Sequence, residues 1–196
     1  MTKYEQLEML MADSNGYLIV SKAVESGISK QYVNDFIKKN HLAKAAPGIY
    51  IAENVWLDTL YVISLRNNVV FSHETALYLH SMTEREPNRI SLTVAKDYNA
   101  THLRKCGFRV YTDTRGLLDE GRTIVDTIHG NPVPVYDVDR TICEIIKMKD
   151  QLDVQFFQYA MKEYMNGKKK DLHNLMYYAK LLNIEDKVRL YTEVML

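Results

Sequence analysis

The sequence lacks the features that would place the protein outside the cytoplasm or mark it as a metalloprotein. It contains only two cysteines, Cys106 and Cys143, which lie far apart in apolar surroundings. Two isolated thiols supply neither a disulfide framework nor the clustered ligands of a zinc site. No segment has the apolar run of a signal peptide or of a membrane span. We therefore expect buried free thiols, no membrane segment and a cytoplasmic location.

The sequence also lacks net charge. The 25 lysines and arginines balance the 25 aspartates and glutamates over 196 residues. No global basic field therefore indicates nucleic-acid binding, and any electrostatic signal must be local. No internal repeat or low-complexity linker divides the chain, and its length allows one large domain or two small ones.

Helical patterns dominate the first part of the chain. Residues 3–12 carry apolar side chains at helical spacing. Ser21 can cap a second, short helix that stops before Gly27, and Ser29 can cap a third. Two extended runs then flank Pro47-Gly48, which is a turn signal of the hairpin type. The order is helix, helix, tight turn, helix, hairpin.

The region around Gly27 has the spacing of a helix-turn-helix. The small Ala23 lets two helices approach, and Gly27 can adopt the left-handed conformation of the turn. Ile28, Val33 and Phe36 then bury the inner faces. The third helix consequently turns its lysines and amides outward, and the hairpin behind it is typical of a winged helix.

This outward side is the predicted DNA-binding surface. Glutamine and asparagine can pair bidentately with adenine, and lysine can donate to guanine or to phosphate. Residues 29–44 contain four lysines and a single acidic residue, Asp35. This segment is therefore basic although the net charge of the whole chain is zero. A solvated helix face, or a surface that binds protein, is the alternative interpretation. The predicted DNA-binding residues are Lys30, Gln31, Tyr32, Asn34, Lys38, Lys39 and, near the tip of the hairpin, Lys44.

The second part of the chain alternates strand and helix patterns. After a helix over 54–67 and another beginning near Ser72, four β-branched or aromatic runs predict strands, and four helical stretches follow. We expect an α+β protein, with an N-terminal winged helix-turn-helix domain over 1–80 and a domain over 81–196 that combines a mixed β-sheet with several helices. The predicted strands are 89–95, 107–112, 122–128 and 131–138, and the predicted helices are 139–149, 153–166, 169–183 and 184–196.

No catalytic signature stands out in this second part. Ser72-His73-Glu74 has the residue types of a triad, but successive residues of a helical turn point in different directions, so Ser72 is expected to cap a helix. Asp139 is expected to cap the next helix, where Glu144 can pair with Lys147. The histidines show no metal-ligand spacing. We expect no catalytic residue, no metal and no cofactor.

In the order and spacing of these motifs the chain resembles the AbiEi family of antitoxins over nearly its full length. The resemblance rests on "GISKQYVNDFIKKNHLAKAAPGIYI" at 27–51, on "SHETAL" at 72–77, and on Asp139-Arg140-Thr141 before an apolar helix. These antitoxins belong to bacterial toxin–antitoxin modules that abort phage infection.

The resemblance implies two roles. The N-terminal domain would repress the promoter of the module by binding inverted-repeat DNA. The C-terminal domain would neutralise a nucleotidyltransferase-like toxin without forming a stable complex with it. Two alternatives stay open from the residues alone. One is a winged-helix protein with a nuclease- or transferase-like C-terminal domain, and the other is a module that binds other proteins.

Overall fold

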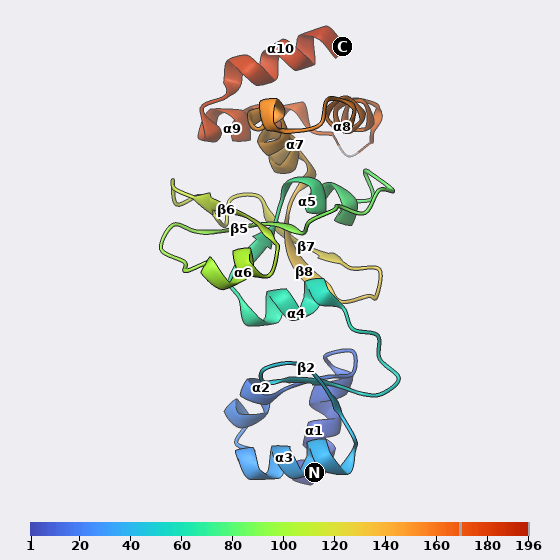
Figure 1. Cartoon of the computed structure of the whole chain (residues 1–196). Coiled ribbons are helices and arrows are strands. Elements are labelled where there is room, and N and C mark those ends of the chain that lie inside the picture. The colour runs from blue at the N-terminus through green and yellow to red at the C-terminus, as the bar shows by residue number, and fades with distance from the viewer. Residues whose placement is uncertain (169, 196) are drawn as a thin grey trace. The chain divides into compact units, whose positions relative to one another are not determined.

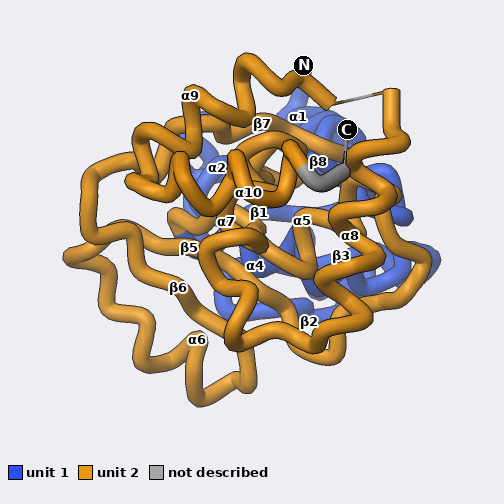
Figure 2. The backbone as a smooth tube through the Cα atoms, turned by 90° about the horizontal axis from the view of Figure 1, so that it is seen from above, with its two compact units in different colours: residues 1–67, 126–132 blue, residues 68–125, 133–196 orange. Residues whose placement is uncertain are grey.

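The computed structural model describes residues 1–168 and 170–195, and these form an α+β fold with ten α-helices and two sheets (Figure 1). The expected fold class is confirmed at this level. The chain divides into two compact units, coloured separately in Figure 2. Unit 1 comprises residues 1–67 together with 126–132, and unit 2 comprises the rest.

Unit 1 builds four helices around a small antiparallel sheet. Strand β3 is central and pairs with β1 on one side and β2 on the other. The expected hairpin is thus confirmed, and β1 adds a third strand to it. The elements are α1 (Lys3–Ala12), β1 (Tyr17–Ile19), α2 (Val20–Glu25), α3 (Lys30–Lys39), β2 (Ala43–Ala46), β3 (Ile49–Ile51) and α4 (Thr59–Arg66).

Segment 126–132 belongs to unit 1 because a buried carboxylate holds it there. Asp58 Oδ1 accepts a hydrogen bond from the N–H of Tyr61 (3.1 Å) and so caps α4. Asp58 Oδ2 accepts from the hydroxyl of Thr127 and from the side-chain amide of Asn131 (2.8 Å). A buried carboxylate requires such partners, so Asp58 fixes this distant segment as well as its own helix.

Unit 2 carries a five-stranded mixed sheet in the order β6-β5-β4-β8-β7. The central strand β4 is antiparallel to β5 and parallel to β8, and β5 is parallel to β6. The elements are β4 (Val69–Phe71), α5 (His73–Leu79), β5 (Ser91–Ala95), α6 (Thr101–Lys105), β6 (Arg109–Asp113), β7 (Arg122–Asp126), β8 (Pro132–Tyr136), α7 (Val138–Lys147), the 3-10 turn η1 (Lys149–Gln151), α8 (Val154–Asn166), α9 (Leu172–Leu182) and α10 (Glu185–Met195).

The core of unit 2 lies among its helices. Leu77 of α5 packs with apolar side chains from α7 to α10, among them Ile142, Tyr164 and Leu175. Figure 1 shows α5 and these C-terminal helices on the same side of the sheet. Most aromatic and methionine side chains of α8 and α9 lie in or against this core, although Tyr159 and Tyr177 are exposed.

The expected boundary between 80 and 81 differs from the division between 67 and 68. Strand β4 is the centre of the five-stranded sheet, and α5 packs against α7, so both belong to unit 2. Because β4 has only three residues, its "VVF" carries too little pattern to be recognised as a strand before a helix.

Several local expectations also need correction. Helix α2 begins at Val20, and no side chain caps it, so Ser21 is not its cap. Asp137, and not Asp139, caps α7 by accepting from the N–H of Arg140 (2.8 Å). Cys106 is exposed, whereas Cys143 is buried as expected. Among the described helices, none is both long enough and apolar enough to cross a membrane.

Candidate functional site

The helix α3 is positioned by a tight turn and a side-chain cap. Gly27 adopts φ +84°, a conformation that favours glycine, and directs the chain from α2 into α3. The N–H of Ile28 donates to the carbonyl of Ala23 (3.1 Å), which closes the turn. Ser29 then accepts a hydrogen bond from the N–H of Tyr32 (3.3 Å), as the sequence predicts.

The apolar face of α3 determines which side points outward. Val33 and Phe36 are buried in the core of unit 1 with Ala23 and Ile28. The Phe36 ring lies 4.9 Å from that of Tyr4, centroid to centroid. Because these contacts fix the rotation of α3 about its axis, the opposite side faces solvent.

Three of the predicted DNA-binding residues form one stripe on that exposed side. Lys30, Asn34 and Lys38 follow one another at four-residue intervals, so they lie on the same face of the helix, and all three are exposed. Gln31 is exposed beside this stripe, where its amide donates to a carboxylate oxygen of Asp35 (3.3 Å). We call Lys30, Gln31, Asn34 and Lys38 the α3 surface.

Tyr32 and Lys39 lie away from the α3 surface. The Tyr32 side chain is half-buried and packs against the core of unit 1. Lys39 is exposed, but its Nζ lies 4.7 Å from the centre of the Tyr4 ring, on the α1 side of the helix. The sequence predicts both as DNA-binding residues because they lie within the same helix. The rotation of α3 instead turns Tyr32 toward the core and Lys39 toward Tyr4 of α1.

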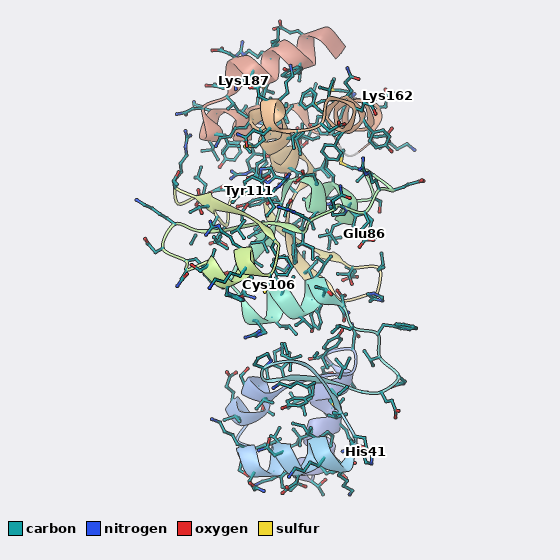
Figure 3. All side chains as sticks on the ribbon, viewed as in Figure 1. His41, Glu86, Cys106, Tyr111, Lys162 and Lys187 are labelled. Atoms are coloured by element: carbon teal, nitrogen blue, oxygen red, sulfur yellow. The ribbon has the colours of Figure 1, made fainter. Side chains whose placement is uncertain are left out.

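Lys44 lies on a strand and not in the turn of the hairpin. It is the second residue of β2, exposed and opposite Tyr50 of β3. The turn itself is Pro47-Gly48, where Gly48 has φ +78°. His41 follows the C-terminal end of α3, before β2 begins (Figure 3). The basic strip of residues 29–44 therefore continues from the helix onto the first strand of the hairpin.

A second polar group of residues, in unit 2, is buried. Ser72 Oγ lies 3.0 Å from His73 Nδ1 and accepts a hydrogen bond from the hydroxyl of Thr93 (2.9 Å). The His73 ring stacks on Tyr111, with centroids 3.6 Å apart, and its Nδ1 is 3.5 Å from an oxygen of Glu144. We call His73, Arg140 and Glu144 the buried polar cluster.

This arrangement corrects the expectations for Ser72 and His73. Ser72 makes no capping hydrogen bond, because its hydroxyl is engaged with Thr93 and His73. Its backbone is extended and that of His73 has φ +51°, so the two are not successive residues of a regular helix and their side chains meet.

The cluster does not have the geometry of a catalytic relay. Ser72 and Glu144 both approach Nδ1 of His73, whereas a relay needs the nucleophile and the acid on different ring nitrogens. Burial, followed by the charge of Arg109, lowers the pKa of His73 to about 3. A neutral histidine of such low basicity is a poor general base near pH 7.

Glu144 is paired with Arg140 and not with Lys147 as expected. An oxygen of Glu144 lies 3.5 Å from Arg140 Nε, one helical turn away, and both side chains are buried. Arg140 Nε and Nη1 and Glu144 Oε2 have no hydrogen-bond partner. The signal that the sequence offered was this pair of opposite charges, four residues apart in α7, with Ile142 and Cys143 between them and Ile145 and Ile146 after them.

A pH-dependent stability difference follows from the burial of Glu144. Burial raises the pKa of this carboxyl from an ordinary 4.5 to about 7, despite the opposing charge of Arg140. As the pH rises from 4.5 to 7, the unfolded chain loses this proton and the folded chain keeps it, so folding becomes less favourable. Glu144→Gln removes this titration. Between pH 4.5 and 7 the free energy of unfolding of the variant should therefore rise by about 3 kcal/mol relative to that of the wild type.

Urea unfolding at about pH 5 and about pH 8 measures this gain. His73, whose pKa is lowered by burial, changes the stability with pH in the opposite sense. Because both proteins contain it, its contribution does not enter the difference between them. A difference between variant and wild type that stays constant with pH would contradict the assignment.

Within the described residues, no group of three or more histidine, cysteine, aspartate or glutamate side chains could hold a metal ion. The α3 surface instead offers exposed cations and amides, which suit a polyanion with hydrogen-bonding edges. In comparison with known proteins, the chain matches no protein-family model and no curated protein.

Proposed function

We propose that the protein is the antitoxin of a toxin–antitoxin module and the repressor of that module's own promoter. In this proposal unit 1 acts as a winged helix-turn-helix that places α3 in the major groove of inverted-repeat DNA. The observation that carries the proposal is the α3 surface, an exposed stripe of lysines and amides on a helix that a tight turn and an apolar core hold in place.

The α3 surface has the chemistry that base readout needs. The amides of Gln31 and Asn34 can each make two hydrogen bonds to adenine, while Lys30 and Lys38 can neutralise phosphates or donate to guanine. Asp35 is the only acidic residue of the 29–44 segment, and its pairing with Gln31 limits its repulsion of DNA. In the free protein this pairing also holds the Gln31 amide in place at the exposed side of the helix.

The hairpin after α3 supports the same function. The antiparallel strands β2 and β3 place Lys44 on an exposed edge that follows α3 in the chain. In the proposed complex this hairpin is the wing, and Lys44 contacts a phosphate beside the groove. Such contacts fix the orientation of the protein, and the bases read by α3 determine the sequence preference.

The antitoxin role rests on the resemblance to the AbiEi family. It assigns toxin neutralisation to unit 2, against a nucleotidyltransferase-like toxin, without a stable complex and without enzymatic activity of the antitoxin itself. The setting would be the cytoplasm of a bacterial cell. A reading frame for such a toxin next to this gene, and rescue of toxin-arrested cells by this chain, are the expected results. Failure of rescue would remove the antitoxin role and leave the proposed DNA binding to be judged separately.

The DNA-binding proposal predicts different effects for the two kinds of residue. Lys30→Ala or Lys38→Ala should weaken binding to all DNA sequences and lower the slope of log affinity against log salt by about 1 each. Gln31→Ala or Asn34→Ala should cost about 1–3 kcal/mol on the operator and relax the base preference. Gel-shift titrations of the full chain on its own promoter, at several salt concentrations, measure both.

Matched controls lie on exposed helices of unit 2. Lys162→Ala on α8 and Lys187→Ala on α10 remove a lysine far along the chain from α3 (Figure 3), and Gln158→Ala removes an exposed amide. These variants should bind like the wild type. Unchanged promoter affinity after all four α3-surface substitutions together would exclude this surface as the DNA-binding site.

A further inference from the structure

Unit 2 contains a pocket of about 230 Å³ beside the buried polar cluster. Its walls come from α5, β5, β6 with the loop that follows, α7 and α9. The proposed DNA contacts of unit 1 make no use of it. The residues that decide its chemistry are Asp113, Thr114, Arg115, Arg140, Glu144 and Lys147.

Three cations line this pocket. Arg140 and Lys147 project from α7, two helical turns apart, and Arg115 comes from the loop after β6. Arg115 and Lys147 line the same pocket, so their like charges repel each other. Partial desolvation and then the charge of Arg115 accordingly lower the pKa of Lys147. A bound anion would relieve this repulsion.

The carboxylates of the pocket do not neutralise these cations fully. Both oxygens of Asp113 accept backbone hydrogen bonds, from the N–H of Arg115 (3.0 Å) and of Leu117 (2.6 Å). Glu144 Oε1 lies 3.5 Å from Arg140 Nε, whereas Oε2, 3.5 Å from His73 Nδ1, makes no hydrogen bond. Because burial raises the pKa of Glu144 to about 7, this carboxyl can retain its proton next to an anion and donate it in a hydrogen bond.

The buried guanidinium provides the second, independent observation. The side chain of Arg140 is 3% exposed and is held against the ring of Tyr136, 4.9 Å from its centroid. Two of its N–H-bearing nitrogens, Nε and Nη1, make no hydrogen bond, and the carboxylate of Glu144 approaches Nε only to 3.5 Å. Leaving donors of a buried cation unpaired is costly, so a ligand that supplies acceptors at this position gains binding free energy.

We propose that this pocket binds the phosphate group of a small phosphorylated molecule. The terminal oxygens of a phosphate can accept hydrogen bonds from donors on several sides at once. The pocket offers three such donors: the guanidinium of Arg140, the ammonium of Lys147 and the hydroxyl of Thr114. A carboxylate, with two oxygens in one plane, leaves part of this donor set unused. A pocket of this volume is smaller than a typical drug-sized site, so the molecule is a phosphate with at most a sugar-sized substituent.

The test is a titration of the full chain with inorganic phosphate and, separately, with ribose 5-phosphate, at constant pH and ionic strength. Amide signals of residues 112–115 and 140–147, observed by NMR, should shift with saturation for at least one of the two. Tighter binding of the sugar phosphate identifies a phosphate monoester as the ligand, and equal affinities identify the free anion. The absence of saturable shifts with both would overturn the proposal.

Substitution locates the site. Replacing buried Arg140 also disturbs folding, so the main variant is Lys147→Gln, which changes an exposed side chain. It should weaken phosphate binding about tenfold or more, because a charge-assisted contact is lost. The matched variant Lys162→Gln on α8 should bind like the wild type. Wild-type affinity in Lys147→Gln would show that phosphate binds elsewhere and would equally overturn the proposal. Promoter binding by Lys147→Gln should be unchanged, so the result is independent of the DNA-binding proposal.

Discussion

Asp139→Ala is expected to lower the free energy of unfolding by about 3 kcal/mol or more, because three donors lose their acceptor. The Asp139 carboxylate is buried and accepts from the hydroxyl of Tyr164 (2.6 Å), the N–H of Asp171 (3.1 Å) and the amide of Asn174 (3.0 Å). These donors belong to α8 and to the start of α9. One carboxylate thus joins three helices, and its loss affects all of their contacts.

Urea unfolding of the full chain, followed by far-UV circular dichroism, measures this loss. Asp153→Ala is the matched control, since Asp153 is an exposed cap that accepts from the N–H of Phe156 (2.9 Å), and its loss should cost about 1 kcal/mol. Equal costs for the two variants would show that the three hydrogen bonds of Asp139 to α8 and α9 stabilise the fold no more than a single exposed cap does.

Phe36→Ala is the second large expected effect, with a cost of about 3–5 kcal/mol in unit 1. The Phe36 ring is 3% exposed and fills the core between α3 and α1, against Tyr4. Unit 1 is small, so a loss of this size is comparable to the whole stability of many domains. The α3 surface then loses its support, and promoter binding should fall with it, although Phe36 itself is not expected to touch DNA.

Hydrogen exchange of the α3 amides distinguishes this effect from loss of a DNA contact. Phe36→Ala should speed their exchange markedly, whereas Asn34→Ala, on the exposed side of the same helix, should leave it unchanged. If Phe36→Ala bound the promoter normally while α3 exchanged freely, the ordered α3 surface would not be required for binding.

The parts of the fold that could be predicted from sequence are those encoded locally. The Ser29 cap, the Gly27 turn, the apolar spacing of α3 and the Pro47-Gly48 hairpin each lie within a few residues of the structure they produce. The sequence therefore correctly predicts that Lys30 and Asn34 are exposed. Lys44 is expected near the hairpin tip but is the second residue of β2, because a sequence pattern does not fix where a strand begins.

The unpredicted parts depend on residues far apart in the chain. Ser72 has the sequence context of a helix cap, but Thr93, 21 positions later, engages its hydroxyl instead. His73 meets Glu144 across the fold, and no periodicity indicates such a contact. The side chain of Asp139 likewise bonds to residues 25 or more positions away. It is therefore not available for the capping role that its sequence neighbours suggest.

The attachment of residues 126–132 to unit 1 has a consequence for how the protein is made. Because the backbone crosses between the units after residues 67, 125 and 132, neither unit is a single continuous stretch, and no one cleavage could separate them. On the ribosome, Asp58 emerges long before Thr127 and Asn131, because the first stretch of unit 2, residues 68–125, is synthesised between them. Unit 1 can therefore reach its final form only after synthesis has passed residue 132.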